Sequence, residues 1–198
     1  MSKAATKDSY HHGDLRSALI DTGLRLLAEK EGADISLREV ARETGVSATA
    51  VYRHFPDKDA LLGALAYAGY EKLFDAQDAA AQGQADREKA FRAIGQAYVH
   101  FAVANPDLFR LMTNCMPSAA DVESGAFPGD NRAGVLLREY IAALLPNGTE
   151  WDRGVAAVQA LALVHGLAQL VLGGQIPNDP KLIDAVVDQF GSWHDSQT

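Results

Sequence analysis

Cysteine is almost absent from this chain, which carries a single thiol, Cys115, in 198 residues. One cysteine cannot form an internal disulfide, so we expect a protein of a reducing compartment, the cytoplasm. The N-terminus also lacks the apolar stretch that a signal peptide requires.

Sequence features of enzymes are lacking too. The chain has no glycine-rich phosphate loop, no Gly-x-Ser-x-Gly nucleophile motif and no histidine near Cys115 in the sequence. His11 and His12 are adjacent but lack the third and fourth ligands that a metal site requires. We therefore expect neither an enzyme, nor a metal site, nor a cofactor.

A basic character is missing from the chain as a whole, whose formal net charge is -8. Residues 1–70 contain nine Lys and Arg against ten Asp and Glu, whereas residues 71–198 contain nine against sixteen. If the chain binds nucleic acid, only the first part can approach phosphates. Its 47% apolar and 22% charged residues are typical of a globular protein with a packed core.

The most apolar window, residues 155–174, is about as long as a membrane span. Gln159, His165 and Gln169 interrupt it, and Arg153 precedes it. We interpret the window as a buried helix and expect no association with a membrane.

Apolar spacing and capping residues predict an all-α fold. Leucines and Ile20 at helical spacing predict a first helix over residues 14–31. Ser36 and Glu39 form the pattern of a capping box at the start of a second helix, which Gly45 ends. Ser47 is expected to cap a third helix over residues 48–54.

A long fourth helix is expected after Pro56, with Asp57 as its cap. Further helices are expected at residues 86–104, 106–114, 131–145, 150–173 and 180–194, with a long loop over 117–130. The Ala-, Gln- and Gly-rich tract near residues 79–85 predicts a domain seam. We thus divide the chain into a flexible N-terminal arm (1–13), a DNA-binding domain (14–56), a connecting helix (57–80) and a ligand-binding and dimerisation domain (81–198).

The second and third helices have the spacing of a helix-turn-helix. That motif needs a small residue where the helices cross, a glycine in the turn and a compact branched residue facing back, and Ala41, Gly45 and Val51 meet these needs. Two ordinary packed helices are the alternative interpretation of these three positions alone.

The wider sequence from Ile35 to Leu62 resembles the DNA-binding region of the TetR family of bacterial regulators. A Gly-Val-Ser turn, a Tyr-x-His-Phe helix end and a following x-x-Lys-x-x-Leu occur together and in order, and the resemblance covers about residues 12–66. It implies a three-helix DNA-binding headpiece, a divergent helical C-terminal domain, and a homodimer that binds a palindromic operator and releases it when a small molecule enters that domain. The alternative is a helical dimeric interaction or sensor protein that has lost specific DNA binding.

The resemblance also implies roles for individual residues. Tyr52, His54 and Lys58 match positions that contact the DNA backbone. Such contacts position the protein on the duplex but do not read its base sequence. Ser47 opens the recognition helix, and Ala48, Thr49 and Ala50 face the groove, where Thr49 can bond a base edge and the methyl groups can meet a thymine. Arg38 and Arg53 are candidates for either a base or a phosphate contact. Lys3, Lys7 and the two histidines form either a basic arm over phosphates or a plain tail.

A ligand pocket is expected among apolar residues of the C-terminal half, because apolar walls with few polar groups suit a drug-sized ligand. The candidates are Tyr98, Phe101, Phe109, Met112, Met116, Phe127 and His165, with core packing as the alternative for each aromatic and Met. The window from Leu161 to Leu170 resembles a Trp-x-x-Val-His-Gly signature of one TetR subgroup, with Leu161 in place of the Trp.

The last two helices are expected to form a four-helix dimer interface. The helix over 150–173 carries small residues that allow close approach, and the last helix carries one apolar stripe. That stripe consists of Leu182, Ile183, Val186, Val187 and Phe190. Packing within one subunit is the alternative.

Overall fold

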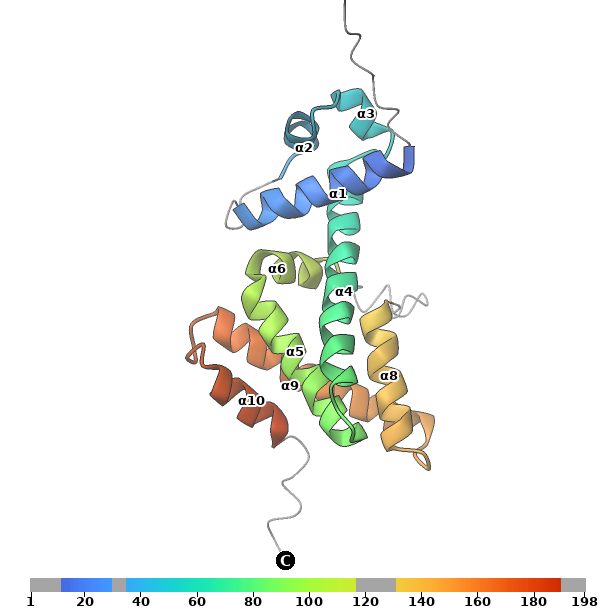
Figure 1. The fold of residues 1–198 in the computed structure, drawn as a ribbon, viewed down its shortest axis with the longest axis vertical. Helices are drawn as coiled ribbons and strands as arrows, with labels where there is room; N and C mark the ends of the chain where they lie inside the picture. The colour runs from blue at the N-terminus through green and yellow to red at the C-terminus, as the bar shows by residue number, and fades with distance from the viewer. Residues whose placement is uncertain (1–11, 30–34, 117–130, 190–198) are drawn as a thin grey trace, which may run out of the picture. The chain divides into compact units, whose positions relative to one another are not determined.

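A computed structural model of the chain describes residues 12–29, 35–116 and 131–189, and within these ranges all regular structure is helical (Figure 1). The helices are α1 (His12–Glu29), α2 (Leu37–Thr44), α3 (Ala48–Tyr52), α4 (Lys58–Gln82), α5 (Arg87–Ala104), α6 (Pro106–Asn114), α8 (Arg132–Leu144), α9 (Glu150–Leu172) and α10 (Pro180–Asp188). The expected all-α fold is confirmed. The N-terminal arm up to residue 11, the loop over 117–130 with Phe127, and Phe190 lie outside the described residues.

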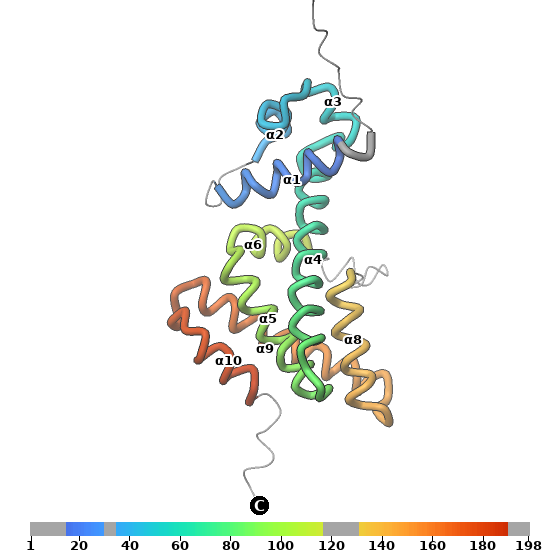
Figure 2. The backbone as a smooth tube through the Cα atoms, in the orientation of Figure 1, coloured from blue at the N-terminus to red at the C-terminus, as the bar shows by residue number. Residues whose placement is uncertain are grey.

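Residue contacts divide the chain into two compact units, Met1–Leu65 and Ala66–Thr198. The division falls within α4, so this one helix contributes residues to both units (Figure 2). The tract over residues 79–85, where the sequence predicted a seam, lies inside the second unit.

Capping side chains start the helices of the first unit at the predicted residues. Ser36 Oγ accepts a hydrogen bond from the Glu39 N–H at 3.2 Å, and Ser47 Oγ accepts one from the Ala50 N–H at 3.2 Å. Asp57 Oδ1 accepts one from the Ala60 N–H at 2.8 Å. Each cap satisfies one of the backbone donors that a helix leaves free in its first turn.

Two helices end earlier than their apolar patterns predicted. α3 ends at Tyr52 and not at His54, because the N–H groups of His54 and Phe55 both donate to the Val51 carbonyl in a closing turn before Pro56. α10 ends at Asp188 and not at residue 194. Gln189 closes this end, since its N–H donates to the Ala185 carbonyl at 3.2 Å, and residues 190–194 of the predicted helix lie outside the described residues.

The core of the first unit joins α1 to α2, α3 and the start of α4. Its fully buried side chains are Leu19, Val40, Val51, Phe55, Leu61 and Leu65. Gly23 lets α1 approach α4 closely, since a Cβ at that position would lie 2.8 Å from Cδ2 of Leu65. The inward position predicted for Val51 is confirmed, and Phe55, the last residue of the Tyr-x-His-Phe motif, is buried as well.

In the second unit α5 is central and packs against α6, α8, α9 and α10. One buried cluster combines side chains of α5, α6, α9 and α10, including Val99, Phe109, Val164 and Ile183. A smaller one combines α4, α5 and α8 through Ala81, Ala90, Ile94 and Leu136. At the start of α8, the Arg132 guanidinium lies 3.7 Å from the centroid of the Phe74 ring and bonds Glu71 at 3.0 Å, which fixes α8 against α4.

The expectation that the apolar window is a buried helix is wrong for a single chain. Among the described residues α9 alone is long and apolar enough to cross a membrane, a property that core helices of soluble proteins share, yet only 28% of its apolar window is buried. One face packs inward through Ala160, Val164, Leu167, Ala168 and Val171. The opposite face, which we call the outward face of α9, is mostly exposed in the single chain. Its members are Trp151, Val155, Val158, Ala162 and Gln169, which are exposed, and Gly166, which is half-buried.

The stripe on α10 does not lie on one exposed face as expected for a dimer interface. Ile183 is 0% and Val187 is 4% exposed, and both pack in the core of their own chain. Gly95 allows this contact, since a Cβ there would lie 3.0 Å from Val187 Cγ1. Of the stripe, Leu182 remains exposed.

Candidate functional site

A left-handed glycine connects α2 to α3. Gly45 has φ +75°, and the Val46 N–H donates to the Ala41 carbonyl at 3.0 Å, which closes the end of α2. Ala41 is 3% and Val51 0% exposed, so the two short helices pack at the positions predicted from their spacing. The turn therefore has the geometry of a helix-turn-helix.

The residues predicted to meet DNA lie on the uncovered side of this motif. Arg38, Ser47, Ala48, Thr49, Tyr52 and Arg53 are exposed, while Ala50, His54 and Lys58 are half-buried. Tyr52 is 46% exposed despite its large ring. The structure thus brings together side chains from the start of α2, all of α3 and the start of α4.

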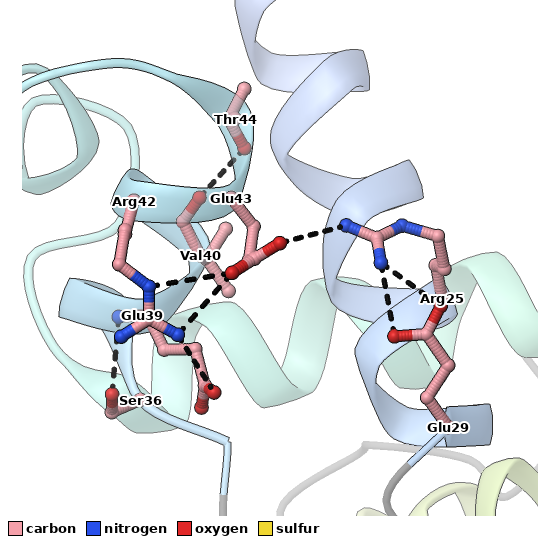
Figure 3. Close-up of polar contacts among 8 residues, drawn as sticks. All are labelled: Arg25, Glu29, Ser36, Glu39, Val40, Arg42, Glu43 and Thr44. Atoms are coloured by element: carbon pink, nitrogen blue, oxygen red, sulfur yellow. Dashed lines mark hydrogen bonds and ion pairs between the residues drawn. The ribbon is translucent and has the colours of Figure 1, made fainter.

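Ion pairs neutralise two other arginines of the first unit, Arg25 and Arg42 (Figure 3). Arg25 donates a hydrogen bond to Glu29 at 2.9 Å and pairs with Glu43 at 3.5 Å, which ties α1 to α2. The hydrogen bond to Glu29 is the main reason that the pKa of Arg25 is raised. Arg42 pairs with Glu39 at 3.4 Å and Glu43 at 3.3 Å.

Arg38 and Arg53, by contrast, pair with no acidic residue among those described. Two arginines of the helix-turn-helix thus have no ion pair among the described residues, although residues 1–70 together are slightly acidic.

A cavity of about 1440 Å³ lies within the second unit, between α4, α5, α8 and α9. Its buried wall includes Leu73, Ile94, Ile141 and Val164. The cavity opens to solvent where Trp151, 79% exposed, lines it at the start of α9. Its volume exceeds the roughly 300–1,000 Å³ of typical ligand pockets because part of it is open.

The predicted ligand residues divide into two groups. Tyr98 and Met116 line the cavity. Phe101, Phe109 and Met112 are buried in the core, 9%, 2% and 2% exposed, and they do not belong to its wall.

His165 is half-buried and belongs to an aromatic cluster beside the cavity. Its Nδ1 lies 3.0 Å from the Tyr98 hydroxyl, and its ring centroid lies 5.4 Å from that of Phe109. Burial lowers the pKa of His165 and raises the pKa of Tyr98, so both groups are held in their neutral forms. His165 thus positions Tyr98 in the cavity wall.

Sequence reasoning missed Gln77, which is 5% exposed and lines the cavity. Its position carried a usable signal, because Leu73, Gln77 and Ala81 follow one another at i+4 and all three are buried. A polar side chain on such an inward face needs a partner.

A glycine turn between two short capped helices, packed on a third and exposing polar side chains, defines a helix-turn-helix DNA-binding domain. Residues 19–65 match the family described as bacterial regulatory proteins, tetR family, and residues 91–190 match the tetracyclin repressor-like C-terminal domain. The chain belongs to the TetR family, as its sequence motifs predicted. Members of this family are transcription regulators and not enzymes.

Known proteins similar to the chain support this assignment. An uncharacterized HTH-type transcriptional regulator of Haemophilus influenzae is 53% identical over 47 residues, which is 23% of either protein. A protein of unknown function from Rhodococcus sp. RHA1 has a structure with TM-score 0.71 and 34% identity, covering 94% of this chain and 96% of that one. A TetR family transcription regulator from Marinobacter aquaeolei VT8, 17% identical, shares the fold with TM-score 0.63 over 87% of this chain and 91% of its own.

Proposed function

We propose that the protein is a cytoplasmic, ligand-released repressor that binds a palindromic operator as a homodimer. The observation that carries the proposal is the exposed surface of the helix-turn-helix, which presents polar side chains and two arginines that pair with none of the acidic residues in the described ranges. Family membership supports the operator, and the outward face of α9 supports the dimer.

On DNA, α3 enters the major groove. Tyr52, His54 and Lys58 contact the backbone, and Thr49 contacts a base edge between the methyl groups of Ala48 and Ala50. Ser47 keeps its capping role, since its hydroxyl already accepts the Ala50 N–H. Arg38 and Arg53 supply further contacts to phosphate or guanine.

The homodimer forms through the C-terminal part of the outward face of α9, which consists of Ala162, Gly166 and Gln169, together with exposed residues of α10 such as Leu182. Trp151, Val155 and Val158, at the other end of that face, line the cavity. Gly166 on this face has nothing within 4 Å of an added Cβ, and Ala162 is exposed, so a second helix can approach closely there. A two-fold protein matches a two-fold operator whose half-sites lie about 34–36 Å apart.

A small molecule in the cavity releases the operator by favouring a subunit arrangement in which the two recognition helices no longer fit successive major grooves. α4 carries the change, because it supplies Leu73 and Gln77 to the cavity and Leu61 and Leu65 to the first unit.

A gel-shift experiment with duplex DNA from upstream of the chain's own gene tests the DNA-binding surface. Tyr52→Ala and Lys58→Ala are each expected to weaken binding to all sequences alike, and loss of the Lys58 charge also lowers the salt slope by about 1. Thr49→Ala is expected to alter the operator preference instead.

Arg25→Ala serves as the matched control, because Glu29 and Glu43 already neutralise this arginine, and we expect it to keep wild-type affinity. Unchanged operator affinity of Tyr52→Ala at physiological salt would show that the recognition surface is wrongly assigned. Absence of specific binding by the wild type would favour an interaction module that has lost DNA binding.

A further inference from the structure

The cavity wall contains a buried side chain whose hydrogen bonding is half complete. Gln77 Nε2 donates to the Ile94 carbonyl at 3.3 Å, and since a carbonyl needs a donor, this bond fixes which end of the amide is nitrogen. Gln77 Oε1 is buried and has no hydrogen-bond partner among the described residues. A buried acceptor left unpaired costs free energy, which a ligand that donates to it recovers.

The surroundings of Gln77 in the cavity are apolar. Leu73, Ile94 and Val164 contribute buried aliphatic groups. Tyr70 also lines the cavity, but its hydroxyl donates to the Met112 carbonyl at 3.3 Å, and burial raises its pKa to about 12, so it keeps that proton. Gln77 Oε1 is therefore an acceptor in a wall where the nearby hydroxyl proton is already used.

Among the described residues that line the cavity, none of the three cationic side chains is buried. Arg92 is 41% exposed and pairs with Glu88 at 3.4 Å. Arg153 donates to the backbone carbonyls of Leu145 and Pro146, and Arg138 is exposed. A carboxylate placed at Gln77 would face a carbonyl oxygen without a buried cation to compensate it, at a high desolvation cost.

We propose that the effector has an apolar body and presents a neutral hydrogen-bond donor, a hydroxyl or an amide N–H, to Oε1 of Gln77. The inference rests on the proposed function in taking this cavity as the effector site. The donor completes the bonding of the glutamine, while the apolar body covers the aliphatic wall. Discrimination then acts against analogues without the donor, because they leave the acceptor buried and unpaired.

Two isomeric probes test the donor requirement. Octan-1-ol and 1-methoxyheptane have the same composition and similar length, but only the alcohol donates a hydrogen bond. By calorimetry on the full chain, we expect the alcohol to bind about tenfold more tightly than the ether, the effect of about one hydrogen bond. Octanoate at pH 7 is expected to bind more weakly than the alcohol.

Substitution of Gln77 tests whether the preference for the alcohol over the ether depends on this residue. Gln77→Met keeps the length of the side chain but removes the acceptor, so the alcohol-to-ether ratio is expected to fall to about one with the ether still bound. Gln82→Met is the matched control on α4, since Gln82 is exposed, bonds Asp78 at 2.7 Å and does not line the cavity. It is expected to keep the tenfold ratio.

Equal wild-type affinity for the two isomers, failure of both to bind, or a preference that survives in a folded Gln77→Met protein would overturn the inference. The wild-type comparison alone remains decisive if Gln77→Met does not fold. A gel shift run in parallel separates this inference from the proposed function. Selective binding of the alcohol without release of DNA would leave the donor site standing and contradict ligand release.

Discussion

At the scale of single residues, the turn needs a glycine at position 45 because of its backbone conformation alone. Its φ of +75° is the left-handed region, and an added Cβ would meet nothing within 4 Å, so a substitution there suffers from backbone strain and not from a clash. Gly45→Ala is expected to destabilise the first unit by about 1 kcal/mol. The check is the urea midpoint of unfolding at fixed protein concentration.

Gly63→Ala is the control for Gly45→Ala. Gly63 lies within α4 in helical conformation, is exposed, and also has nothing within 4 Å of an added Cβ. Alanine is therefore expected to increase the free energy of unfolding by roughly 0.5–1 kcal/mol, which raises the urea midpoint. Shifts of the same sign in both variants would contradict the strain argument.

Side-chain type alone could not locate the cavity wall. Phe109, Met112 and Met116 look equivalent in the sequence, yet the first two fill the core and the third lines the cavity. The difference arises from how α6 packs against α4 and α5, which no local pattern specifies. Gln77 was missed because a polar side chain is not expected at an inward position of a helix such as α4.

At the scale of helices, the starts were predictable because caps are local. Ser36, Ser47 and Asp57 each accept a bond from a backbone N–H three residues away, and such bonds need no tertiary partner. Helix burial was not predictable in the same way. α9 has an apolar pattern suited to a core helix, but its neighbours within one chain cover only one face.

The outward face of α9 predicts where a charge breaks the proposed dimer. Ala162 is exposed in the single chain and lies outside the cavity wall, so Ala162→Glu does not disturb the core of one subunit. We expect this variant to sediment as a 21.2 kDa monomer, whereas the wild type sediments at twice that mass.

Ala79→Glu, on an exposed position of α4, is the control for Ala162→Glu and is expected to remain dimeric. Val187 is unsuited to this test, because a charge there would disrupt the core that it shares with Ile183. An Ala162→Glu protein that stays dimeric would move the interface to another surface.

At the scale of the whole molecule, ligand release requires reciprocity. If a cavity ligand weakens operator binding, the operator must weaken ligand binding by the same factor, about 5 to 150-fold for a coupling of ~1–3 kcal/mol. Calorimetry of octan-1-ol, or of a stronger ligand found by screening, with and without operator measures that factor. Equal ligand affinity in both titrations would exclude release by this route even with a functional cavity.

An apolar helix face that one chain leaves exposed also makes the proposed dimer depend on the concentration of the protein. If the chain dimerises through the outward face of α9 as proposed, association adds to the apparent stability by mass action, and dilution removes that contribution. At low concentration a larger fraction of chains is then single and lacks the two-fold symmetry of the proposed palindromic operator. The number of copies in a cell, and not the proposed ligand alone, then sets how much of the protein can bind that operator.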